Sequence, residues 1–108
     1  MQESEFDRAL LDSLDETLTE VLSAELKDAF YRHLEVTTCI VREGLPNRLD
    51  DLASVLSTIF GSTGSVVLER AIAKRLYSKL EIRFIEKPGY NLLNYFRDAK
   101  IANRGKAE

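Results

Sequence analysis

The sequence has no tryptophan, and it has only one cysteine, one histidine and two prolines among its 108 residues. The single cysteine, Cys39, excludes an intramolecular disulfide. With His33 as the only histidine, the chain also lacks the several Cys and His ligands of a structural zinc site. A free thiol without disulfides is typical of a reducing compartment, so we expect a cytoplasmic protein.

The sequence also lacks an unbroken apolar run of the ~18 residues that a transmembrane helix needs. Its N-terminus, MQESEFDRALLDSLDE, is acidic and amphipathic, whereas a signal peptide starts with basic residues followed by a continuous apolar stretch. We therefore expect neither a membrane span nor a secretion signal. Apolar residues make up 44% and charged residues 31% of the chain, which is the balance of a globular protein with room for one hydrophobic core.

The two ends of the chain carry opposite charge. Residues 1–28 contain nine acids and two bases, a net charge near −7, and residues 70–106 contain ten bases and three acids, near +7. The two segments can face each other within the fold or across a dimer. They can equally form separate binding faces.

Apolar residues recur at helical spacing in five segments. These segments are residues 4–22, 24–38, 46–60, 65–80 and 91–102. Ser23 and Asn91 are the predicted N-caps of the second and last helices. Pro46 suits the first turn of the third helix, and Gly61 is predicted to end it in the left-handed conformation. The sequence leaves open whether the first two helices are separate or form one bent rod.

The apolar stripes predict which side chains face the core. They comprise Phe6, Leu10, Leu14, Leu18, Val21 and Leu22; Leu26, Phe30, His33, Leu34 and Thr37; Leu45, Leu49, Leu52, Ala53, Leu56, Ile59 and Phe60; Val67, Leu68, Ala71, Ile72, Leu76, Tyr77 and Leu80; and Leu92, Leu93, Phe96 and Ala99. The last helix should end at about Ala102.

The segments between the predicted helices are short. Residues 62–65 are expected to be a connector, and residues 81–87 an extended segment with Ile82 and Phe84 anchored inward, because a lone strand has no partner. Residues 103–108 should fray. The predicted fold is all-α: one domain of residues 1–108, a compact bundle of about five helices with one short extended connector.

Four stretches of the sequence together resemble a known family. They are SAELKDAFYRHLE at 23–35, NRLDDLASVLSTIFG at 47–61, VVLERAIAKRLYSKL at 66–80 and EKPGYNLLNYFRDAK at 86–100. They resemble a small archaeal domain family named as an output domain of Nitrosopumilus-type signalling proteins, over nearly the whole chain. The resemblance implies a helical module in archaeal signal transduction or gene regulation. It brings no catalytic or ligand residues.

Three groups of residues are candidate sites, and each also has a simpler interpretation. His33, Glu35 and Cys39 suggest nucleophilic or redox chemistry, but a partly buried histidine and an inert small thiol are more typical. Asp12 with Asp15 or Glu16 could hold a hard cation, although such acids usually form a solvated helix face. Residues 61–65 precede a helix like a phosphate loop, but they lack the full motif and a preceding strand, which favours a tight turn.

The basic residues of the fourth predicted helix are the remaining candidate. Arg70, Lys74, Arg75 and Lys79 form two i, i+4 pairs that predict a face for nucleic acid or for an acidic partner. The acidic overall charge and the core role of the same helix argue against DNA.

The sequence thus predicts a non-enzymatic regulatory or protein-interaction module without cofactor, metal or membrane, with a protein partner or self-association. The alternative is a DNA-binding transcriptional regulator that uses the basic fourth helix.

Overall fold

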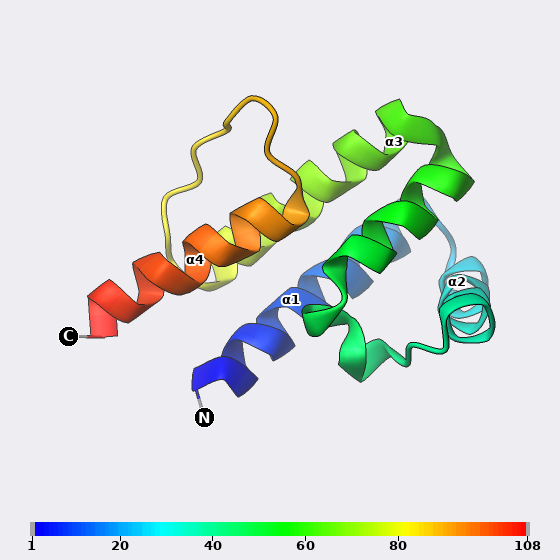
Figure 1. Ribbon diagram of the computed structural model, residues 1–108, viewed down its shortest axis with the longest axis horizontal. Helices are drawn as coiled ribbons and strands as arrows, with labels where there is room; N and C mark the ends of the chain where they lie inside the picture. Colours follow the sequence, from blue (N-terminus) through cyan, green and yellow to red (C-terminus); the bar gives the residue numbers. More distant parts are fainter. Residues whose placement is uncertain (1, 108) are drawn as a thin grey trace.

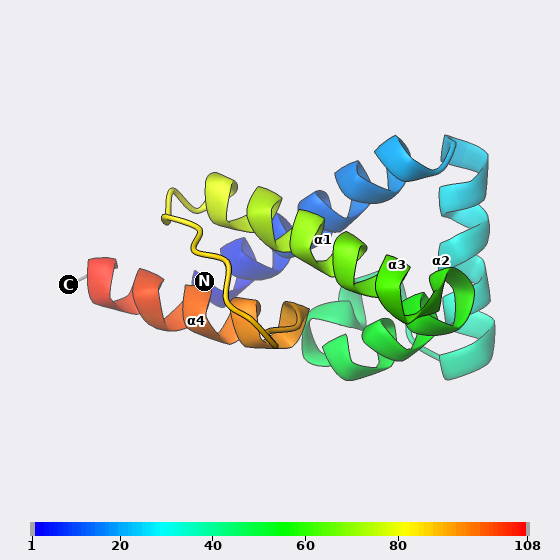
Figure 2. The ribbon, with the colours of Figure 1, turned by 90° about the horizontal axis from the view of Figure 1, so that it is seen from above.

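The computed structural model describes the backbone of residues 2–107 and the side chains of residues 5–102. Its elements are α1 (Gln2–Val21), α2 (Ala24–Thr38), the 3₁₀ helix η1 (Arg42–Asn47), α3 (Leu49–Lys79) and α4 (Leu92–Ala107). The ribbon shows α1, α3 and α4 packed together, with α2 across one end of the molecule (Figures 1 and 2). Residues 2–107 contain no strand, and the predicted all-α fold is confirmed.

Helices α1 and α2 are separate. Ser23 has extended backbone angles, and its hydroxyl accepts a hydrogen bond from the Leu26 amide at 3.2 Å, as expected of an N-cap. Helix α2 ends where Cys39 adopts the left-handed conformation (φ 59°) and its amide donates to the Glu35 carbonyl. The predicted bounds of α2 are therefore confirmed.

Pro46 does not lie in the first turn of α3, as predicted. It belongs to η1, and Arg48, with non-helical angles (φ −134°, ψ 43°), separates this turn from α3. Leu45 and Pro46 are both buried, so η1 packs its apolar side into the core. The chain makes a tight extra turn there because burial of these two side chains outweighs continuation of the helix.

Helix α3 bends sharply at Gly61, and we call residues 49–60 its first arm and residues 62–79 its second arm. The predicted break at Gly61 is right, and the two arms form a V (Figure 1). The angles of Gly61 (φ 81°, ψ 166°) lie in a region that only glycine occupies readily, not in the predicted left-handed helical region. The predicted connector at 62–65 is wrong, because a single glycine makes the whole turn and residues 62–65 are already helical.

By length and composition, α3 is the one described helix that could cross a membrane. Its apolar stretch is divided by the bend at Gly61, and Leu68, Ile72 and Leu76 of the second arm are buried in the protein core. The absence of a membrane span, expected from the sequence, stays a prediction.

The core lies between α1, both arms of α3 and α4. Leu10, Leu14 and Leu18 of α1 are almost fully buried, as are Leu56 and Ile72 on the two arms of α3. Each such side chain stabilises the fold by roughly 1.5–3 kcal/mol through removal of apolar surface from water. The packing of α1 and α4 on α3 thus forms the core of the molecule.

Several residues that were predicted to face inward are exposed. They are Val21, Leu26, His33, Thr37, Ile59 and Val67. Most lie on α2 or near a helix end or the bend of α3, where a neighbouring helix no longer covers the stripe. Helix α2 contributes only Phe30 and Leu34 to the buried core. Periodicity identifies an apolar face but not how far the neighbour extends over it.

Residues 81–91 form the predicted extended connector and turn. The Ile82 amide donates to the Tyr77 carbonyl at 2.9 Å, and Ile82 and Phe84 are half-buried against the core, which confirms their inward anchoring. The Phe84 ring lies 5.1 Å from the Tyr95 ring between centroids. Tyr95 was absent from the predicted stripe and is buried.

Helix α4 begins as predicted and ends later than predicted. The side chains of Asn91 and Asn94 each accept a hydrogen bond from the other's amide, at 2.9 and 3.1 Å, and this reciprocal cap starts the helix. The backbone remains helical past Ala102 to Ala107. The side chains of residues 103–108, for which fraying was predicted, lie outside the described part of the chain.

Candidate interaction surfaces

Two of the four predicted site bases pair with α1. Arg75 lies 2.8 Å from the Glu20 carboxylate and 3.4 Å from that of Glu16, and Lys79 donates to Glu16 at 2.6 Å. The hydrogen bond from Lys79 lowers the pKa of Glu16 below its usual value; desolvation opposes this shift, and the charges of Lys79 and Arg75 add to it. Part of the opposite charge of the two chain ends is therefore neutralised within the fold.

The other two bases point to the connector. Arg70 forms an ion pair with Glu86 at 3.5 Å, and the Lys74 ammonium lies 6.0 Å from the centre of the Phe84 ring. Positions 70 and 75 are about 140° apart around an α-helix, which explains why the two pairs reach different neighbours. The structure thus brings Arg70, Lys74, Arg75 and Lys79 together as two separate pairs on opposite flanks of the second arm, without one continuous basic face.

A polar cluster joins α1, α2 and η1. The Asp15 carboxylate accepts hydrogen bonds from the Tyr31 hydroxyl at 2.5 Å and from the Arg42 guanidinium at 2.5 and 3.3 Å. Burial raises the pKa of Asp15, but the hydrogen bonds from Arg42 and Tyr31 outweigh it and leave the pKa below its usual value. Burial and the adjacent Asp15 raise the pKa of Tyr31 well above that of a free tyrosine. The cluster holds α2 against α1.

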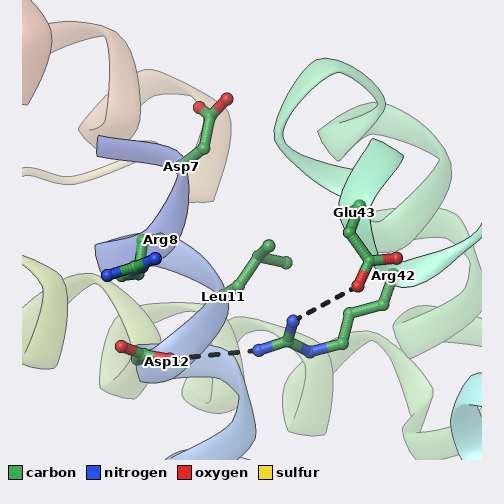
Figure 3. Close-up of a pocket in the computed structure, with 6 residues that line it drawn as sticks. All are labelled: Asp7, Arg8, Leu11, Asp12, Arg42 and Glu43. Atoms are coloured by element: carbon green, nitrogen blue, oxygen red, sulfur yellow. Dashed lines mark ion pairs between the residues drawn. The ribbon is translucent and has the colours of Figure 1, made fainter. Parts of the chain in front are cut away.

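An open depression lies beside this cluster (Figure 3). It has a volume of about 370 Å³ and is lined by Asp7, Arg8, Leu11, Asp12, Arg42 and Glu43. Arg42 reaches across it from η1, with its guanidinium 3.9 Å from Asp12 and 3.7 Å from Glu43. Because this guanidinium already engages three carboxylates, the depression presents mixed, largely satisfied charge and not a cationic pocket.

The acidic metal candidates of α1 have other partners. Asp15 is bound by Arg42 and Tyr31, and Glu16 by Lys79 and Arg75. Among the described residues, no group of three or more His, Cys, Asp or Glu side chains is placed to hold a metal ion. The acids of α1 serve as ion-pair partners in this structure.

His33 and Cys39 do not form a catalytic pair here. The His33 ring lies 3.4 Å from the Thr37 hydroxyl, and both His33 and Cys39 are exposed. The expected partial burial of this histidine is therefore wrong, and the thiol is exposed as well. Cys39 is exposed because it follows the last turn of α2 in the left-handed conformation.

The predicted glycine-rich turn at 61–65 contributes a structural contact. The buried Ser65 hydroxyl donates to the Glu69 carboxylate at 2.8 Å, and Glu69 accepts from the Leu92 amide at 2.9 Å. Sequence reasoning missed Glu69, whose position between Leu68 and Ile72 on the inward face was the available signal. A glutamate there links the second arm of α3 to the beginning of α4.

The outer face of α2 carries two exposed large apolar side chains. Leu26 is 56% exposed and Val36 is 77% exposed, and Ala29 and His33 lie between them on the surface. Positions 26, 29, 33 and 36 share one face of the helix. Beside this stripe on the helix, Phe30 and Leu34 pack into the core. The apolar surface of α2 is thus broad, and the fold covers only one side of it.

Comparisons of the chain with protein-family models, with curated proteins and with solved structures gave no match.

Proposed function

We propose that the chain is a non-enzymatic helical module that binds a protein partner through the outer face of α2. The observation that carries this proposal is the exposure of Leu26 and Val36 on a helix that is already held to the core by the adjacent Phe30 and Leu34. Burial of such side chains in a partner's groove is the usual source of affinity when an amphipathic helix is recognised. The cytoplasmic location remains part of this proposal.

The resemblance to the archaeal output-domain family supports a place in signalling. In that role the module would relay a signal by contact with another protein, without chemistry of its own. A surface for a partner is the one feature such a module requires.

The test is a quantitative pull-down from the cells that naturally express the chain. We expect Val36→Glu to remove the specific partners, because a charge placed in an apolar contact loses its hydration without gaining a partner. Ile101→Glu is the matched control, since it also places a glutamate at an exposed apolar position, 67% exposed, but on α4 and not on α2. Equal recovery of partners by both variants would remove the proposal.

The alternative, DNA binding through the second arm of α3, has weaker support. Arg70, Arg75 and Lys79 already pair with carboxylates, so a phosphate would have to displace these acids. Reversal of Arg70, Lys74 and Arg75 to glutamate should abolish any salt-dependent shift of duplex DNA. Absence of binding by the wild-type chain at low salt would eliminate the alternative.

A further inference from the structure

The exposed stripe of α2 has the spacing of a helix-pairing surface. Leu26, Ala29, His33 and Val36 follow at intervals of three, four and three residues, as residues do along the contact line of two paired helices. At a rise of about 1.5 Å per residue the stripe is about 15 Å long. Ala29, the smallest of the four, lies near its middle and would allow two helices to approach closely.

Two opposite charges flank the stripe on the same edge. Glu25 and Arg32 are seven residues apart, two helical turns, so both side chains lie beside the stripe on one side. Both are exposed, and neither forms an ion pair within the described part of the chain. They are therefore available to a partner that presents the reverse order of charge.

We propose that a second copy of this chain is the partner and that the two α2 helices pair antiparallel about a two-fold axis near Ala29. In this arrangement Glu25 of each copy lies opposite Arg32 of the other, which gives two equivalent ion pairs. Val36 of each copy then lies level with the start of α2 in the other, close to the end of α1, where Val21 is 51% exposed. An isologous contact requires this kind of self-complementarity.

The charge order selects this arrangement over the alternatives. In a parallel pair, the edge with Glu25 and Arg32 in one copy would face the other edge of the stripe in its partner. That edge carries Phe30, which is buried, and Thr37, so Glu25 and Arg32 would meet no opposite charge. Glu16 and Glu20 of α1 are already paired with Arg75 and Lys79 of α3 within one chain and need no second copy. Helix α2 lies at one end of the molecule, where its outer face is accessible (Figure 2).

This inference rests on the proposed function, because it names the partner of the same face. One helix per subunit buries less than the ~800 Å² per partner of a standard interface. We therefore expect a reversible dimer that dissociates on dilution.

Sedimentation velocity over about 1 µM to 1 mM protein tests the proposal. The wild-type chain should shift from monomer to dimer with concentration. Glu25→Arg and Arg32→Glu should each weaken the dimer by at least about tenfold, because each places like charges opposite each other twice. An equimolar mixture of the two variants should restore dimers, and so should the double variant Glu25→Arg, Arg32→Glu.

Glu35→Arg is the matched control, since it makes the same charge change on an exposed position of α2 outside the stripe, and it should not weaken the dimer. Circular dichroism checks that each variant is folded. Val36→Glu tests the same contact independently and should weaken the dimer, whereas its control Ile101→Glu should not. A wild-type monomer at all concentrations would overturn the proposal, as would a dimer whose charge variants are not rescued by mixing. If the chain is monomeric while its pull-down partners still depend on Val36, the dimer fails and the proposed function stands. If neither holds, both fail.

Discussion

The carboxylate of Glu69 should be one of the most important polar groups for the stability of this fold. It is 7% exposed and accepts hydrogen bonds from the Ser65 hydroxyl at 2.8 Å and from the Leu92 amide at 2.9 Å. The Leu92 amide belongs to the first turn of α4, where backbone amides have no partner inside the helix. A negative charge there is also favoured by the helix dipole.

We expect Glu69→Ala to lower the free energy of unfolding by about 2–4 kcal/mol. The substitution removes two hydrogen bonds to a charged group and leaves the buried Leu92 amide without an acceptor. Glu69→Gln should cost only about 1 kcal/mol, because its amide oxygen still accepts from Leu92 and its amino group can donate to Ser65. For a domain of this size, the alanine variant should melt roughly 8 °C lower or more.

Urea denaturation followed by circular dichroism measures these differences, and hydrogen exchange of the Leu92 amide measures the local effect. Exchange at Leu92 should accelerate more than exchange in α1, because the lost acceptor is local to the start of α4. The exposed Glu35→Ala serves as control and should change stability by less than about 0.5 kcal/mol. A loss below about 1 kcal/mol for Glu69→Ala would refute the reasoning.

Three further predictions concern pH and backbone strain. The pKa of Asp15 is lowered because the hydrogen bonds to its carboxylate, chiefly from Arg42, outweigh the effect of burial. The ionised Asp15 carboxylate therefore stabilises the fold fully above the usual pKa of 3.8, and this stabilisation is lost as the pH falls through the lower pKa of the folded state. Asp15→Asn should lower the free energy of unfolding by about 1–2 kcal/mol near neutral pH. It should also flatten the acid limb of a curve of stability against pH. Burial raises the pKa of Tyr77 from 10.0 to about 12, so the stability due to its neutral form is complete below 10 and is lost as pH rises through 12. Tyr77→Phe should make alkaline unfolding less steep, which ultraviolet titration and denaturation together detect; an unchanged alkaline limb would contradict it. Gly61→Ala should destabilise by about 2 kcal/mol because its φ of 81° with ψ of 166° is strained for alanine. Gly44 has no positive φ, and a Cβ there would make only ordinary contacts, so Gly44→Ala should change stability little. Thermal denaturation of both variants measures the difference. Equal losses of stability in the two variants would show that Gly61 is not strained.

Local signals in the sequence were sufficient for the helices and their caps. Ser23 and Asn91 are N-caps as predicted, since a capping side chain acts on an amide only a few residues away. The extended connector with Ile82 and Phe84 anchored inward was also predictable, because a strand pattern without a second strand leaves few alternatives. These features depend on residues close together in the chain.

Features that depend on a distant neighbour were not predictable. Leu26 and Val67 have the spacing of core residues, but nothing in the sequence states that α1 and α4 do not reach over them. The spacing of the bases of the second arm already turns them to two sides of the helix. Only the placement of the segments in space shows which acids they meet, those of α1 on one flank and Glu86 on the other.

The sequence alone determined an all-α chain with acidic and basic ends, because periodicity, capping and net charge are properties of neighbouring residues. The tertiary structure decided which charges meet, that a single glycine folds α3 back on itself, and that Glu69 links α3 to α4. It also decided that the outer face of α2 stays exposed. Burial and ion pairing arise between segments far apart in the chain, so their outcome depends on the distances that packing sets.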